Sequence, residues 1–282
     1  MLKTYFLFLP ALFISHLFLL ASEPCVQKIQ SSHFLEGEIK RVIGFSREAY
    51  DYHPSIDLTV WDALQPYFLP TDHPVRSILD LIFKSDRVTL NREKFIAAGF
   101  DVNDPKASGN LIVGRHPLLP GYLIKAYLDT QIEWEWENFF RRVTGARSIE
   151  QCIQKYGFQN YFEVPKKWIY PLPLNPSPPS NGAYYRKNFI LLVEDKYILN
   201  QAENAKAFRN RITPQILNAL YLVLTEEGLI DSVFRGNIPF NHFGRMCFID
   251  TEHHHHGPIP YYNLDRYLSP EMRIYWQSLY LK

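Results

Sequence analysis

Two ionisable residues within apolar stretches are the first candidates for chemistry. Lys125 lies in the β-prone run Tyr-Leu-Ile-Lys-Ala, and Asp250 follows Cys-Phe-Ile at the end of another such run. A charged side chain in a buried strand is costly unless an opposite charge compensates it. Asn237 lies thirteen residues before Asp250. An Asn and an Asp at neighbouring strand ends can hold a divalent cation through oxygen ligands, so the pair predicts a metal site.

Each of these residues also has a purely structural interpretation. Lys125 taken alone is typical of a lysine that packs its stem on an edge strand and keeps its head in water. Asn237 taken alone is typical of a turn, and Glu150 of the solvated face of a predicted helix. The order of the four residues along the chain favours the functional interpretation.

A strand lysine, a helix glutamate, a loop asparagine and a strand-end aspartate, in this order, resemble the protein-kinase-like superfamily. The resemblance is nearer to the atypical and bacterial small-molecule branches, and it covers roughly residues 100–252. It implies that ATP is bound with Mg²⁺, that Lys125 holds the phosphates and that Glu150 orients Lys125. It also implies that Asn237 and Asp250 hold the metal ion. The same helix offers three other carboxylates that could replace Glu150, namely Glu133, Glu135 and Glu137.

The resemblance assigns further parts of the nucleotide site. Glu194 falls in the segment that would connect two lobes beside the adenine. A degenerate phosphate loop would be formed by Ser108, Gly109 and Asn110. The catalytic base would be Asp231, provided that the loop has one extra residue, because Ser232 occupies the position five residues before Asn237.

The chain departs from the family pattern in ways that leave its activity open. It has no His-Arg-Asp triplet and no G-x-G-x-x-G loop, and only 32 residues follow Asp250. These departures predict a reduced C-terminal lobe. Two functions therefore stand side by side: a possible phosphotransferase of unknown substrate, and a pseudokinase-like module that engages a protein partner without chemistry.

Four consecutive histidines directly follow this region. His-rich tracts often bind transition metals, although consecutive residues cannot all face one ion in regular structure. The structural interpretation is a polar loop after Asp250, and the alternative is an exported metal-binding protein. The histidines concerned are His253, His254, His255 and His256.

Apolar periodicity predicts the elements that must position these residues. The predicted strands cover 111–113, 122–128, 168–172 and 189–199, and the first two form a hairpin or adjacent strands. The predicted helices include 131–155, with a break near Gly145, a helix that begins at Thr213-Pro214, and a helix that begins at Ser269-Pro270. A strand, a turn at Asn241–Gly244 and a second strand precede Asp250.

These elements predict an α+β fold. By the resemblance, it would be a two-lobed kinase-like fold with a mostly helical N-terminal extension over 25–100. Residues 101–199 would form a β-rich N-lobe-like part with the connecting segment, and residues 200–282 a reduced C-lobe-like part.

The N-terminus predicts export. Lys3 precedes an almost wholly apolar stretch over 4–21, and small residues follow it, which is typical of a signal peptide over 1–22. An uncleaved helix that anchors the chain is the alternative, because about 18 apolar residues nearly span a bilayer. After signal removal, no segment is expected to cross a membrane. ATP is scarce outside a cytoplasm, so export favours the binding-module interpretation.

The composition excludes several classes. The 282 residues are 46% hydrophobic, with 5 Trp, 18 Tyr and 20 Phe, which is too apolar and aromatic for a disordered chain. The net charge is +1, so nothing favours nucleic acid as a partner. Three cysteines, Cys25, Cys152 and Cys247, do not make a disulfide framework.

Overall fold

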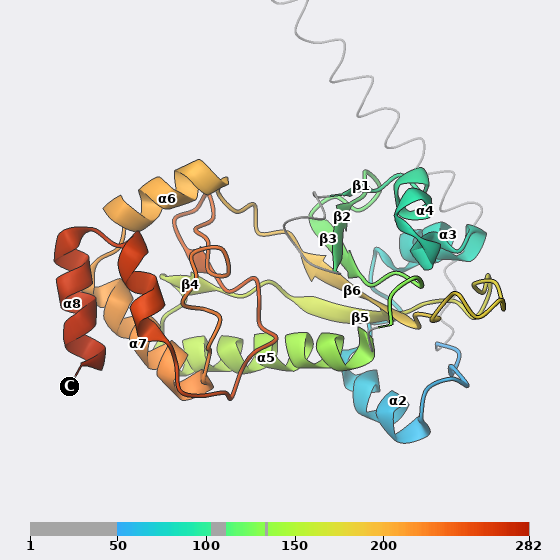
Figure 1. Cartoon of the computed structure of the whole chain (residues 1–282), viewed down its shortest axis with the longest axis horizontal. Coiled ribbons are helices and arrows are strands. Elements are labelled where there is room, and N and C mark those ends of the chain that lie inside the picture. Colours follow the sequence, from blue (N-terminus) through green and yellow to red (C-terminus); the bar gives the residue numbers. More distant parts are fainter. Residues whose placement is uncertain (1–49, 103–110, 133–134, 282) are drawn as a thin grey trace, which may run out of the picture. The chain divides into compact units, whose positions relative to one another are not determined.

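The computed structural model describes residues 50–102, 111–132 and 135–281, all within one compact unit, Glu48–Lys282. The predicted signal peptide over 1–22 and the predicted phosphate loop at Ser108, Gly109 and Asn110 lie outside the described residues. Within the described residues, the fold combines helices with an antiparallel sheet, which is the predicted α+β class (Figure 1). No helix of this part is long and apolar enough to cross a membrane.

The centre of the sheet is built from the segments predicted as strands. It has five strands in the order β1-β2-β3-β6-β5, and each neighbouring pair is antiparallel. The strands are β1 (Asp101–Val102), β2 (Ile112–Arg115), β3 (Tyr122–Ala126), β5 (Lys167–Pro171) and β6 (Phe189–Glu194). The predicted hairpin is confirmed, since β2 pairs with β3, and Val113 lies opposite Lys125. The strand predicted over 189–199 ends at Glu194.

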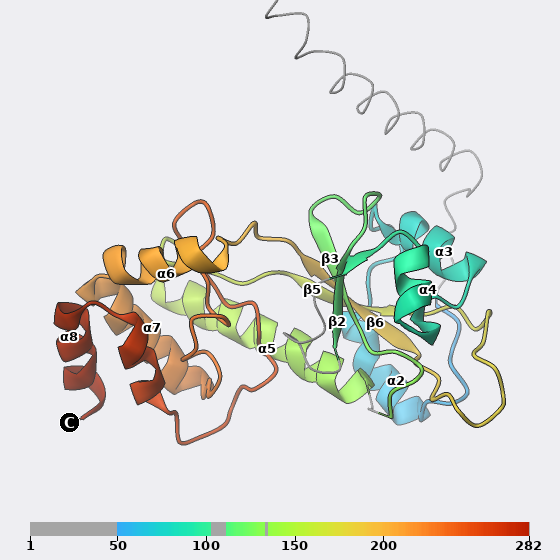
Figure 2. The ribbon, with the colours of Figure 1, turned by 45° about the horizontal axis from the view of Figure 1, so that its top comes forward.

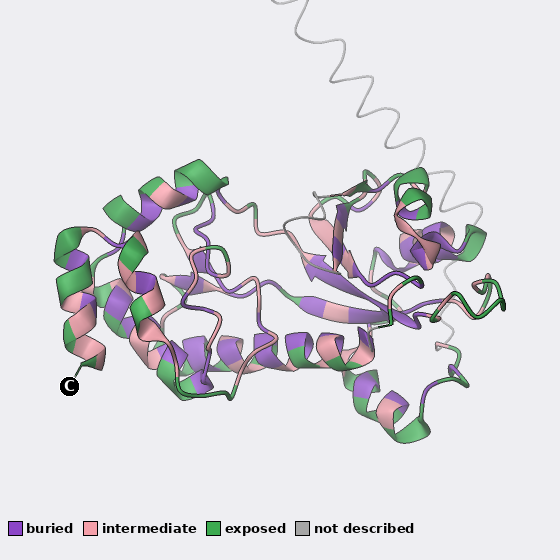
Figure 3. Ribbon diagram, viewed as in Figure 1, coloured by how far each residue is buried: buried purple, intermediate pink, exposed green. Residues whose placement is uncertain are grey.

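Helices before β1 pack with the sheet. They are α2 (Leu58–Leu64), α3 (Arg76–Ser85) and α4 (Arg92–Ala97), joined by the short 3-10 helices η1 (Gln65–Tyr67) and η2 (Val88–Leu90). Leu79 of α3 and Phe95 of α4 belong to one apolar cluster with Ile190 of β6. Trp61 of α2 belongs to a second cluster with Phe189 and Leu191 of the same strand. Because side chains alternate along a strand, β6 is buried on both faces (Figure 3).

The remaining helices form the other end of the described part (Figure 1). They are α6 (Gln201–Asn210), α7 (Pro214–Glu227), the 3-10 helix η4 (Tyr261–Tyr267) and α8 (Pro270–Tyr280). Local signals fix two of these helices as predicted. The Thr213 side chain accepts a hydrogen bond from the Ile216 N–H with Pro214 in the first turn of α7, and Ser269 caps α8 in the same way. A third apolar cluster, which includes Phe208, Leu220 and Trp276, fills this end.

One long helix, α5 (Glu135–Tyr156), reaches both ends of the described part (Figure 2). It contacts β5 and β6 of the sheet and also α7. The prediction of a break near Gly145 is wrong, because the helix runs through it. A Cβ at Gly145 would overlap the carbonyl oxygen of Thr251, so the glycine lets the chain segment that follows β7 (Met246–Cys247) lie against the helix.

The strand pair before Asp250 also differs from the prediction. The turn is present, since the Gly244 N–H donates to the Asn241 carbonyl at 3.1 Å. The first predicted strand is reduced to a single bridge between Phe240 and Met246. β7 pairs instead with β4 (Phe162–Glu163), in parallel. The sequence around either strand does not predict this pairing, because β4 and β7 are far apart in the chain.

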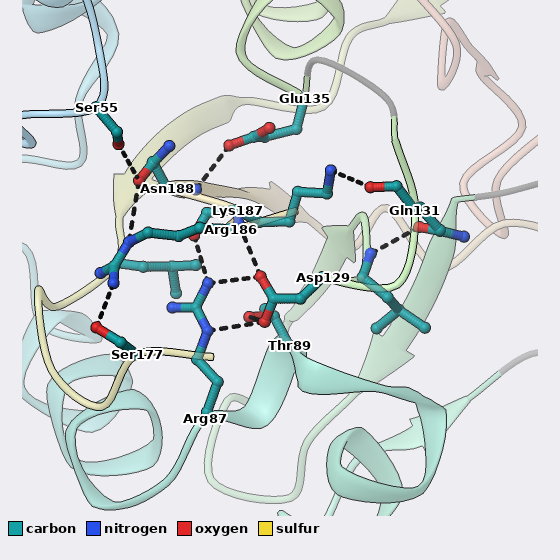
Figure 4. Close-up of polar contacts among 12 residues, drawn as sticks. Ser55, Arg87, Thr89, Asp129, Gln131, Glu135, Ser177, Arg186, Lys187 and Asn188 are labelled. Carbon is teal, nitrogen blue, oxygen red and sulfur yellow. Dashed lines mark hydrogen bonds and ion pairs between the residues drawn. The ribbon is translucent and has the colours of Figure 1, made fainter. Parts of the chain in front are cut away.

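A buried polar network holds the helices before β1 to the start of β6 (Figure 4). Arg87 makes a two-pronged contact with Asp129, with Nε to Oδ2 at 2.8 Å and Nη2 to Oδ1 at 2.7 Å. The Lys187 N–H also donates to Asp129, and Arg87 donates to the Lys187 carbonyl. Arg87 and Asp129 are both buried, so one positive charge is matched by one negative charge.

Replacing Gly145 with alanine should destabilise the protein by about 1–3 kcal/mol, although alanine favours helices. The new methyl group would meet Thr251 backbone, which cannot rotate aside as a flexible side chain would. Urea unfolding followed by tryptophan fluorescence measures the change. Gly236→Ala is the matched control, because a Cβ there has nothing within 4 Å. Equal stability of the two variants would contradict the close approach.

Replacing Arg87 with methionine should cost about 3–5 kcal/mol, because Asp129 would be left as a buried carboxylate without its cation. Lys94→Met removes the partner of Asp86 in an ion pair whose two side chains are about half exposed, and it should cost less than about 1 kcal/mol. Chemical unfolding of both variants measures the contrast. A small effect of Arg87→Met would show that the network contributes little.

Candidate functional site

Lys125 lies in the third strand of the sheet, between β2 and β6, with Val113 and Leu191 opposite it. Its side chain is partly buried. Burial, followed by the neighbouring Arg142 guanidinium, lowers the pKa of Lys125 to about 8, whereas Asp250 and Glu252 act in the opposite direction. The predicted lysine and the predicted aspartate, from distant parts of the chain, are therefore close enough to interact electrostatically.

Arg142 of α5 bridges the two carboxylates that follow β7. Its Nη1 donates to Asp250 Oδ1 at 2.5 Å, and its Nη2 donates to Glu252 Oε2. Burial alone would raise the pKa of Asp250, but the positive charges of Arg142, Lys125 and Lys167 bring it below its ordinary value. Asp250 is thus an ionised carboxylate at neutral pH.

A second buried lysine joins the site from β5. Lys167 Nζ donates to Thr251 Oγ1 at 2.6 Å, and Thr251 Oγ1 donates to the Arg142 carbonyl at 2.6 Å. Burial, together with the charges of Lys125 and Arg142, holds the pKa of Lys167 well below its ordinary value, although Asp250 acts against this. Thr251 therefore ties β5 and α5 to the segment that carries Asp250.

We call the five residues Lys125, Arg142, Lys167, Asp250 and Glu252 the basic cluster. It contains three basic side chains and two carboxylates, so in its fully ionised form it has an excess of one positive charge. Arg142 is 6% exposed, and its Nε has no hydrogen-bond partner among the described residues. Buried donors are normally satisfied, so this atom is an exception that calls for an explanation.

The loop between α7 and β7 lies next to the same segment. The Ile249 N–H donates to the Asn237 carbonyl at 3.0 Å, which holds Asn237 beside the residue before Asp250. Asn237 Nδ2 donates to the Asp231 carbonyl at 3.0 Å. The predicted base and the two predicted metal ligands thus lie on two adjoining stretches of chain. His253 Nε2 is 3.4 Å from Asp231 Oδ2, and both side chains are more than one third exposed.

Glu150 does not join this group. It lies eight residues beyond Arg142 on α5, which is about 12 Å along the helix axis. The electrostatic partners of Lys125 are Arg142, Asp250 and Glu252. The expectation that Glu150 orients Lys125 is therefore corrected, because the turn of α5 that packs against the Asp250 segment presents an arginine.

Two of the three alternative helix carboxylates have other partners. Glu135 Oε1 accepts a hydrogen bond from the Asn188 N–H at 2.6 Å, and burial raises its pKa. Glu137 pairs with Arg141 on the surface of the helix, and Glu133 lies outside the described residues.

Glu194 lies at the end of β6, where the predicted connecting segment begins. Its carboxylate forms an ion pair with Lys196 at 2.7 Å and accepts a hydrogen bond from the Lys166 N–H. Residues Ser108, Gly109 and Asn110, predicted to cover the phosphates, lie outside the described residues.

Three of the four histidines attach the segment after Asp250 to two helices. The N–H groups of His255 and His256 donate to the carbonyls of Glu227 and Gly228 at the end of α7. His254 Nε2 is 3.2 Å from Thr144 Oγ1 of α5. Within the described residues, the group that gathers three metal-ligating atoms is a different one, Cys152, Glu226 and Glu227. There Glu226 is paired with Lys155, and burial raises the pKa of Cys152 to about 11.

The donors of the predicted magnesium site are oxygens of the right kind, but their surroundings do not suit a dication. Asp250 Oδ1 already accepts a hydrogen bond from Arg142, and Lys125 and Lys167 also act on this carboxylate. A divalent cation would add two positive charges to a cluster with a positive excess. The magnesium site stays a prediction, and these three basic residues are the physical argument against it.

Two of the three basic residues of the cluster were missed by sequence reasoning. Lys167 begins β5 in the run Pro-Lys-Lys-Trp, and its buried position is decided by strand register. Arg142 is one of two consecutive arginines on α5, of which Arg141 is exposed. The helical period is a signal that could have found the buried member, because Arg142 lies three residues after Phe139 and four before Ala146, which are both buried.

No family model, no curated protein and no solved structure matches this chain. The site is therefore interpreted from its own geometry and charge.

The low pKa of Lys125 predicts a pH-dependent stability. Its pKa is about 8 in the folded chain and about 10.5 when exposed, so between these values the unfolded chain binds more protons. The contribution of Lys125 should therefore raise the free energy of unfolding as pH increases from about 8 to 10.5, by up to about 3 kcal/mol.

Chemical unfolding at pH 7 and pH 10 measures this contribution by comparison with Lys125→Met, which should lack it. The free energy of unfolding of Lys125→Met minus that of the wild type should be higher at pH 7 than at pH 10. Lys206→Met, at an exposed position of α6, is the control and should keep the wild-type dependence. The same pH dependence in all three proteins would contradict the depressed pKa.

Proposed function

We propose that this chain is an exported kinase-like protein that binds the phosphates of a nucleotide at the basic cluster. The observation that carries the proposal is the meeting of Lys125, from β3, with Asp250, which follows β7. These are the two residues whose roles the kinase resemblance defines most sharply, and they belong to different elements of the fold.

The charge of the cluster supports an anionic ligand. Lys125, Arg142 and Lys167 come from β3, α5 and β5, and only two carboxylates oppose them. Concentrating basic side chains in a partly buried site is costly unless an anion compensates them. The phosphates of a nucleotide supply that compensation.

The arrangement of elements is compatible with a two-lobed interpretation. In this proposal, the five-stranded sheet with α2, α3 and α4 is one lobe, and α6, α7 and α8 belong to the other. The segment after Glu194 connects them beside the adenine. Asp231 and Asn237 lie on the loop after α7, and Asp250 on the next stretch of chain, so all three come from the second lobe.

If the protein transfers phosphate, Asp231 is the group that fits the role of base. Its carboxylate is partly exposed, and its main-chain carbonyl is fixed by Asn237. An acceptor hydroxyl oxygen would bond to the terminal phosphorus, the bond to the nucleoside diphosphate would break, and the hydroxyl proton would pass to Asp231. Positioning and charge neutralisation supply most of the rate in such reactions.

A pseudokinase-like module that binds a protein partner is the second candidate function. The contact of Arg142 with Asp250 favours it, because a carboxylate held by an arginine is less available to a catalytic metal ion. The nucleotide would then stabilise a binding surface and would not be consumed.

Nucleotide binding is tested by thermal unfolding of the purified protein with ATP, ADP or GTP, each with Mg²⁺ and with EDTA. A nucleotide present at about 100 times its Kd should raise the Tm by roughly 5–10 °C. Lys125→Met should abolish this shift, and Lys206→Met should keep it. If none of the nucleotides raises the Tm under either condition, the proposal is wrong.

Phosphate transfer is tested separately with labelled ATP. A transferase should form labelled product that Asp231→Asn eliminates, while the nucleotide-induced Tm shift is retained. Binding without any turnover in the wild type would favour the second candidate function.

A further inference from the structure

We propose that the phosphates bind at the basic cluster without a divalent cation, because Arg142 supplies the positive charge in the metal's place. This inference rests on the proposed nucleotide site. The ligand class is a compound with a di- or triphosphate group, and pyrophosphate is its smallest representative.

The position of Arg142 is the first argument. Its guanidinium contacts Asp250 and Glu252, so it lies beside the carboxylate predicted to hold magnesium. A metal ion at Asp250 Oδ1 would compete with Arg142 Nη1, which donates to the same oxygen at 2.5 Å. Moving the guanidinium away would cost this contact in a buried place, which is unfavourable.

The charge of the cluster is the second argument. When all five side chains are ionised, Asp250 and Glu252 offset two of the three basic charges and leave one in excess, and without an anion the pKa of Lys167 is held well below its ordinary value. Adding a bare divalent cation would raise this excess, whereas adding a phosphate group would remove it. The charge of the cluster therefore favours an anion over a free divalent cation.

The unpaired donor is the third argument. Arg142 Nε is buried and has no hydrogen-bond partner among the described residues. The two Nη atoms already contact carboxylates. An arginine has five N–H donors in a planar fork, and phosphate oxygens match this geometry, so an anion in the cluster can supply an acceptor for Nε.

The backbone around Arg142 limits any rearrangement. The Thr251 hydroxyl donates to the Arg142 carbonyl, and Lys167 donates to the same hydroxyl. One turn further along α5, Gly145 lies so close to the Thr251 carbonyl that a Cβ would overlap it. The helix is thus fixed against the segment of Asp250, and Arg142 cannot leave the cluster by a shift of α5.

The test measures binding of ADP and of pyrophosphate to the purified protein by calorimetry, in EDTA and in excess Mg²⁺. We expect binding in EDTA, and Mg²⁺ should weaken it several-fold, because the magnesium complex of either ligand carries less negative charge. Tight binding that requires Mg²⁺ would overturn this inference and leave the proposed nucleotide site intact. Binding under neither condition would overturn both.

Two substitutions sharpen the test. Arg142→Gln removes the positive excess and the competitor for Asp250, so binding in EDTA should fall at least about tenfold and Mg²⁺ should now restore it. Arg142→Lys keeps the charge but not the planar fork, so its binding should be weaker than that of the wild type and should still not require Mg²⁺. Arg141→Gln, at the adjacent exposed position, is the control and should bind as the wild type does.

If Arg142→Gln fails to fold, the wild type and Arg142→Lys still decide the inference through their response to Mg²⁺. Equal affinity of wild type and Arg142→Gln in EDTA would also overturn it, because the arginine would then have no part in holding the anion.

Discussion

The contact of Arg142 with Asp250 and Glu252 is the interaction on which the site depends. It joins α5 to the segment after β7, and neither carboxylate would be stable near the sheet without a cation. Thr251, between the two carboxylates, adds hydrogen bonds to the Arg142 carbonyl and to Lys167 of β5. The sheet, the long helix and the loop segment are therefore fixed together by charges and by one hydroxyl group.

Two buried charged networks in this fold differ in how completely their arginines are hydrogen-bonded. Arg87 donates from Nε and Nη2 to Asp129, and the neighbouring main chain supplies further hydrogen bonds. In the basic cluster, Arg142 Nε has no partner among the described residues. An incomplete network of this kind is the better candidate for binding.

The predicted magnesium site illustrates how one side chain, that of Arg142, changes which ligand a group of residues can bind. A carboxylate and an amide beside a lysine resemble a magnesium–nucleotide site, and Asp250, Asn237 and Lys125 provide these groups. Arg142 changes the balance, because its positive charge offsets the negative charge of the carboxylate. The same scaffold then favours an anion by itself, and catalysis, if present, would depend on positioning by residues such as Asp231.

The sequence by itself determined the elements with strong local signals: the strands around Lys125 and Leu191, and the helices that begin at Thr213-Pro214 and Ser269-Pro270. It also pointed to Lys125 and Asp250, because a charge in an apolar run stands out locally. Only the tertiary structure decided which residue of α5 meets them. That choice depends on how α5 packs against the segment after β7, where Gly145 allows the close approach of Thr251, and no local pattern encodes a contact between residues so distant in the chain.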